Sequence, residues 1–197
     1  MTSSTEKFER AFQVFDQYNK QDPNPFIWEG NTYPQEYFLS LKLHGWILKL
    51  SPDAGEALLL ASRCQHIGRW EIPRGDYPQD REGYLTWRKA LSLYHAEKAE
   101  ELLAPIGYSA DTIERVKQIV RKIKLKADHE VQLMENALCL VFLQFQYEDF
   151  WPRHTDKIVD ILRKSLKKMD AEGHRHALAL DYSAQGKQHV EAALAQL

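Results

Sequence analysis

Residues 128–145 read DHEVQLMENALCLVFLQF, and this stretch decides the fold class. Its apolar side chains would surround a helix on nearly all sides, which is typical of a helix buried at the centre of a domain. A polar line still runs along it, at spacings of four, three and four residues, through Asp128, Gln132, Glu135 and Cys139. Burying a carboxylate without a partner costs several kcal/mol. We therefore expect Glu135 to meet a cation, a hydrogen-bond donor, a metal ion or water.

Helical periodicity recurs along the rest of the chain, and no stretch shows the sustained alternation of a strand. The pattern predicts helices over residues 5–18, 34–50, 52–67, 83–103, 109–123, 128–145 and 155–169, with a weak helix around His176 and a last one from Ser183. Pro34 fits a first helical position, and Ser109 and Thr155 fit N-caps. We expect an all-α fold, a single-domain helical bundle over residues 1–197.

Composition limits the function classes. Hydrophobic residues make up 44% of the 197 residues and charged residues 27%, which is ordinary for a globular protein. The net charge of -2 gives no overall field for nucleic acid or anionic membrane, so we expect neither as a partner. Two cysteines make no disulfide framework, and no apolar run reaches the length of a bilayer span. These features predict a cytoplasmic protein without a membrane segment.

Polar residues gather on the predicted core faces of three helices. Tyr84, Arg88, Leu91 and His95 recur at helical spacing, and His66 ends an earlier helix directly before Ile67, Gly68 and Arg69. We predict one pocket, built around His66, Arg69, Arg88, His95 and Glu135. A single buried histidine is more often a hydrogen-bonded core residue, and a structural ion-pair network is the alternative for the whole set.

The loop before the fourth predicted helix is rich in arginine and aromatic residues. Arginines recur at Arg69, Arg74, Arg81 and Arg88, interleaved with Trp70, Tyr77, Tyr84 and Trp87. Guanidinium forks bind phosphate or carboxylate, and aromatic rings stack on planar groups. The pattern favours a small anionic ligand. We expect five further residues to support the site: Tyr77, Trp87, Lys126, Asp128 and Gln132. In the alternative, acidic residues of the same loop pair with the arginines and no ligand binds.

Two short motifs mislead. The run from His66 to Arg69 and the run from Lys168 to Asp170 are similar to parts of the signatures of class I aminoacyl-tRNA synthetases. Those signatures work on a Rossmann-type sheet, for which this chain has no predicted strands. The histidines at positions 154, 174 and 176 match no zinc-binding spacing.

Several runs together resemble a known family, the domain-of-unknown-function family 4202. They are ASRCQHIGRWEIPR from Ala61 to Arg74, GYLTWR from Gly83 to Arg88, KLKAD from Lys124 to Asp128 and CLVFL from Cys139 to Leu143, together with Tyr77-Pro78, Arg81 and His95. The resemblance covers nearly the whole chain. It implies relatedness and no particular activity.

A remoter similarity links the chain to the HD-domain phosphohydrolases. It is carried by Gln65-His66-Ile67-Gly68, His95 and Glu135-Asn136. The resemblance implies an all-helical core on which histidines and aspartates hold a metal ion that activates water against a phosphate ester. This chain departs from the pattern, because the His-Asp doublet reads Gln65-His66, the distal acid falls at Glu135 or Asn136, and the first histidine is missing unless His44 serves.

The sequence thus leads to two function hypotheses. In the first, the protein is a degenerate HD-like hydrolase for a small anionic or phosphorylated substrate. Here His66, His95 and Glu135 hold a metal or act as acid and base, and Arg69, Arg74, Arg81 and Arg88 clamp the anion. In the second, the same residues form a closed network in a non-catalytic binding or interaction module. We expect an anion near the arginines and no tightly held metal. The sequence does not identify a cofactor or an oligomeric state.

Overall fold

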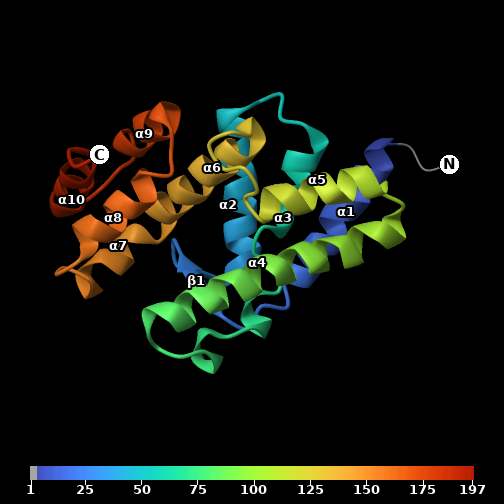
Figure 1. The fold of residues 1–197 in the computed structure, drawn as a ribbon, viewed down its shortest axis with the longest axis horizontal. Helices are drawn as coiled ribbons and strands as arrows, with labels where there is room; N and C mark the ends of the chain where they lie inside the picture. Colours follow the sequence, from blue (N-terminus) through green and yellow to red (C-terminus); the bar gives the residue numbers. More distant parts are fainter. Residues whose placement is uncertain (1–3) are drawn as a thin grey trace. The chain divides into compact units, whose positions relative to one another are not determined.

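Helices make up most of residues 4–197, the part of the chain that this computed structural model describes (Figure 1). The prediction of a mainly helical fold is confirmed. The chain divides into two compact units, Met1–Ile123 and Lys124–Leu197. That both units fold together as one domain stays a prediction.

The first unit contains five long helices, a hairpin and three short 3-10 turns. In chain order these are α1 (Ser4–Asn19), β1 (Pro25–Trp28), β2 (Asn31–Pro34), α2 (Gln35–Leu50), α3 (Glu56–Cys64), η1 (Arg69–Glu71), η2 (Arg74–Asp76), α4 (Arg81–Leu103), η3 (Ala104–Ile106) and α5 (Ala110–Val120). Helix α3 packs against α1, α2 and α5, and α4 packs against α5 and α1. Helix α5 therefore contacts both α3 and α4.

The hairpin corrects the all-α expectation. Strands β1 and β2 pair antiparallel, with Phe26 opposite Tyr33 and the turn at Glu29-Gly30. The rings of Phe26, Trp28 and Tyr33 pack on Phe38 of α2. Each strand has only four residues, too few for alternation to stand out in the sequence. Aromatic packing against α2, more than strand propensity, fixes the hairpin in place.

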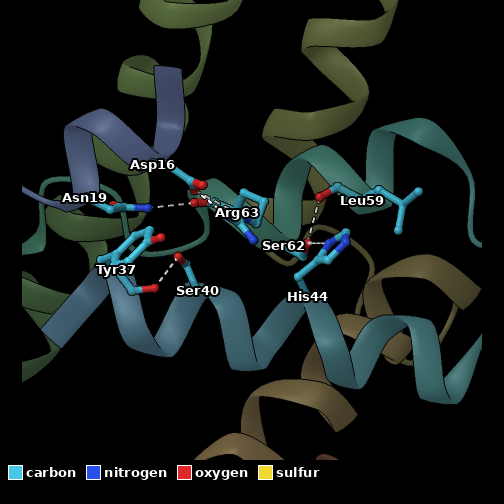
Figure 2. A network of polar contacts seen from close by, with 8 residues as sticks. All are labelled: Asp16, Asn19, Tyr37, Ser40, His44, Leu59, Ser62 and Arg63. Carbon is cyan, nitrogen blue, oxygen red and sulfur yellow. Dashed lines mark hydrogen bonds and ion pairs between the residues drawn. The ribbon is translucent and has the colours of Figure 1, made fainter. Parts of the chain in front are cut away.

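A buried polar network joins α1, α2 and α3 (Figure 2). The Arg63 guanidinium forms an ion pair with Asp16, and the Asn19 side chain donates to the Arg63 carbonyl at 2.9 Å. The Ser62 hydroxyl donates to the Leu59 carbonyl at 2.6 Å, so it accepts from Nδ1 of His44, 2.9 Å away. Burial, followed by the charge of Arg63, lowers the pKa of His44 to about 4. His44 therefore has a structural role in this network.

The second unit is built around residues 128–145, the apolar stretch that predicted a central helix. It contains α6 (His129–Phe145), α7 (Tyr147–Phe150), η4 (Trp151–Arg153), α8 (Ile158–Leu166), α9 (Ala171–Leu178) and α10 (Ala184–Leu194). Helix α6 packs against α7 and α9, and α8 packs against α10. Ten residues of α6 are buried, as its apolar circumference predicts. No helix within residues 4–197 combines the length and apolar character needed to cross a membrane.

Helix boundaries show where local sequence rules held. Ser109 and Ser183 cap α5 and α10, because each side chain accepts a backbone N–H three residues ahead. The prediction of a cap at Thr155 is wrong, since α8 begins at Ile158 after Lys157. The third helix is shorter than predicted and begins after Gly55.

Candidate functional site

A cavity of about 250 Å³ opens in the first unit, where the segments that follow α3 and α5 face the middle of α4. Three groups of side chains line it. The end of α3 and its turn give Gln65, His66 and Arg69, α4 gives Arg88, Lys89, Leu91, Ser92 and His95, and the end of α5 gives Val120, Arg121 and Lys122. The structure thus brings together four of the five residues of the predicted pocket.

The turn after α3 points two of these side chains at the cavity. Gly68 has a φ of 67°, a left-handed conformation that glycine adopts without strain. A Cβ atom at this position would lie 2.7 Å from a ring carbon of Tyr94, so space as well as conformation requires glycine. Ile67 is buried and anchors the turn. His66 and Arg69 are therefore held on either side of a fixed reversal of the chain.

Helix α4 contributes its residues by periodicity. Arg88, Ser92 and His95 are spaced by four and three residues and so share one face. The deep end of this face is buried, with His95 only 3% exposed, whereas Arg88 and Lys89 are exposed. The same helix therefore supplies both the floor of the cavity and part of its rim.

The lining is strongly basic. Its five permanent cations are Arg69, Arg88, Lys89, Arg121 and Lys122, and no carboxylate belongs to the lining. Within the described residues, Arg88, Lys89 and Arg121 form no ion pair with a carboxylate. Because like charges repel, this concentration of cations favours a bound anion.

His95 is fixed as a neutral imidazole. Its Nδ1 lies 2.7 Å from the Ile67 carbonyl, which can only accept, so Nδ1 carries the proton. Nε2 is then left with its lone pair. Burial lowers the pKa of His95 to about 4 against the effect of this hydrogen bond. Near neutral pH, His95 is therefore a neutral hydrogen-bond acceptor.

His66 lies beside His95, with ring centroids 5.7 Å apart. Burial, with added repulsion from Arg69 and His95, lowers the pKa of His66 well below its ordinary value. The His66 side chain is 27% exposed to solvent. Both imidazoles are therefore neutral near pH 7, and His66 is the more accessible of the two.

Glu36 of α2 is a residue that the sequence prediction missed. Its carboxylate is 4% exposed, with one oxygen 3.8 Å from His66 Nδ1 and the other 3.9 Å from Arg69 Nε. Burial raises the pKa of Glu36 to about 7, although Arg69 opposes the shift. The available signal was a glutamate in helical register with the buried Leu39 and Leu43.

The other predicted loop residues do not line the cavity. Arg74 donates to the carbonyls of Tyr77 and Asp80, and its guanidinium lies over the ring of Trp87. The Trp87 indole donates to the Ile72 carbonyl at 2.9 Å. Arg81, the first residue of α4, is exposed. Arg74, Tyr77 and Trp87 thus hold the loop together through carbonyl groups and ring stacking.

The remaining predicted residues belong to the second unit. Glu135 is 2% exposed, and its carboxylate lies 3.8 Å from Lys168 Nζ. Lys126, Asp128 and Gln132 line a separate, open cavity together with Ala127, His129, Met169 and Asp170. Asp128 also caps α6, and Gln132 donates to Asn136 and to the Lys168 carbonyl. These side chains have structural partners within their own unit.

Comparison with known proteins identifies the family. A model of the domain of unknown function DUF4202 matches residues 9–190. The chain belongs to the DUF4202 family. No curated protein and no solved structure matches it.

The DUF4202 chain does not present the donor set that the HD resemblance implies. Within residues 4–197, no three His, Cys, Asp or Glu side chains are grouped so that they could hold one metal ion. His44, the candidate for a first histidine, bonds to Ser62 in the network of Figure 2. The comparisons do not show a similarity to HD-domain proteins.

Proposed function

We propose that the DUF4202 protein binds a small phosphate-bearing anion in the cavity between α3, α4 and α5, and that it hydrolyses a phosphate ester there. One observation carries the proposal: five cations and no carboxylate line a cavity that also holds two neutral imidazoles. Arginine binds phosphate through two parallel N–H donors, which adds geometry to charge. Arg69 is best placed for this, beside His66.

Hydrolysis needs a group that takes a proton from the attacking water. His66 can do so, because the Glu36 carboxylate stands 3.8 Å behind its Nδ1 and stabilises the imidazolium that forms. As the water oxygen bonds to phosphorus, the ester P–O bond breaks, and the leaving oxygen takes its electron pair and then a proton from solvent. His95 accepts a hydrogen bond at Nε2 and orients a polar group of the ligand. No step in this scheme runs through a metal ion, since the described residues offer no fitting set of donors.

A second candidate function is a non-catalytic anion-binding module. It is favoured by the pKa of His66, which burial and then the charge of Arg69 lower well below its ordinary value, because this makes His66 a weak base near neutral pH. Both functions use the same cavity and the same cations. They differ in turnover, so hydrolysis of an aryl phosphate separates them.

The first test removes the guanidinium of Arg69 from the cavity. Arg69→Gln should weaken binding of inorganic phosphate by roughly 10- to 100-fold, because a hydrogen bond from a charged donor contributes about 1.5–3 kcal/mol. Isothermal titration calorimetry measures this at fixed ionic strength. Arg81→Gln is the matched control, an exposed arginine outside the cavity, and should bind phosphate as the native protein does. Equal affinities for native and Arg69→Gln protein would remove Arg69 from the site.

A further inference from the structure

The cavity has two layers that differ in burial and charge. Its floor is formed by buried side chains, among them Gln65 and His95 at 4% and 3% exposure. Arg69 and His66 stand at intermediate depth. Arg88 and Lys89 of α4 and Arg121 after α5 are exposed and form the rim. An anion seated at the floor thus has further cations between itself and solvent.

The charge of the cavity exceeds that of one phosphate group. Glu36 is the carboxylate within ion-pair distance of Arg69, and the rim cations Arg88, Lys89 and Arg121 form no ion pair with a carboxylate of residues 4–197. Both imidazoles are neutral near pH 7. A phosphate monoester carries about two negative charges at that pH. It would leave the exposed rim cations Arg88, Lys89 and Arg121 without a bound counter-charge.

Lys122, which also lines the cavity, has an unusual backbone conformation. It follows the last turn of α5 with a φ of 58°, the left-handed conformation in which helices commonly place glycine. A side chain there costs conformational energy. The position nevertheless holds a lysine, and its side chain lines the cavity.

We propose that the ligand carries at least two linked phosphoryl groups. The terminal group reaches Arg69, beside His66, at intermediate depth in the cavity. The next group lies at the rim, between the α4 cations Arg88 and Lys89 and the α5 cation Arg121. This inference rests on the proposed function, because it names the class of anion that the same cavity takes.

The test compares inorganic phosphate, pyrophosphate and citrate by calorimetry, at one ionic strength and with a chelator present. The native protein should bind pyrophosphate at least tenfold more tightly than phosphate. In the triple variant Arg88→Gln, Lys89→Gln, Arg121→Gln, pyrophosphate affinity should fall more than phosphate affinity, so that the preference for pyrophosphate is lost. All three side chains are exposed, so folding should be preserved, which thermal unfolding checks. Arg81→Gln, on the same helix, should keep the full preference.

The results of this test distinguish a ligand with two phosphoryl groups from anion binding in general. Equal affinities for phosphate and pyrophosphate would overturn the two-phosphoryl ligand and leave anion binding intact. Citrate binding as tight as pyrophosphate would also overturn it, because general charge attraction would then account for affinity. Failure of the native protein to bind any of the three anions would contradict the proposed function itself.

Discussion

Replacing His66 by asparagine is expected to lower hydrolysis of an aryl phosphate by roughly 10²- to 10⁴-fold, the usual contribution of a proton-transferring side chain. Asparagine keeps a polar group in the cavity but cannot take a proton near pH 7. Phosphate affinity should change little, because the cations remain. Phosphate release measured under saturating substrate, with calorimetry alongside, gives both quantities. Unchanged turnover in the variant would favour the non-catalytic binding module.

The rate of hydrolysis should depend on pH through the protonation of the Glu36 carboxylate. The pKa of Glu36 is about 7, so its carboxylate is protonated below that pH and charged above it. Activity should therefore rise as pH increases through about 7. Glu36→Gln should remove this inflection, whereas Glu97→Gln, at an exposed position of α4, should keep it. An inflection that survives in Glu36→Gln would show that another group titrates.

Asp16→Ala should lower the free energy of unfolding by about 3 kcal/mol, because it leaves the guanidinium of Arg63 buried without its carboxylate. The Arg63 side chain is 7% exposed and that of Asp16 is 22% exposed, which places the effect at the lower end of the usual range. Urea unfolding followed by circular dichroism measures the change. The pair of Asp160 and Arg163, whose side chains are 48% and 33% exposed, is the more exposed control, and Asp160→Ala should have little effect.

A double variant tests the reason for that loss. Asp16→Leu with Arg63→Met removes both charges and keeps apolar volume, so it should recover much of the stability that Asp16→Ala loses. If the double variant were as unstable as Asp16→Ala, packing or the Asn19 hydrogen bond would dominate in the network of Figure 2.

The helical part of the fold could be predicted because its signals are local. The apolar circumference of 128–145 and the capping serines need no knowledge of distant residues. The hairpin could not be predicted in the same way, since its strands are short and depend on packing against Phe38. Thr155 had the chemistry of a cap, but α8 begins three residues later.

The site was predictable to the extent that it follows helical register. The spacing of Arg88 and His95 placed both on one face, and His66 joined them through the turn at Gly68. Glu36 was missed because a single acid in a first helical turn is ordinary, and only the tertiary structure brings it to His66. The arginines at 74 and 81 share the residue type of Arg69 without its position. Residue type alone therefore predicted more arginines for the site than line the cavity.

We propose that the cavity between α3, α4 and α5 of this DUF4202 protein binds a phosphate-like anion. Crystals soaked in tungstate, a heavy analogue of phosphate, test this proposal through an anomalous difference map. We expect a peak inside the cavity, within hydrogen-bond reach of the Arg69 guanidinium, that is absent from crystals of Arg69→Gln. A map in which tungstate occupies other surface lysines and arginines, and leaves this cavity without a peak, would contradict it.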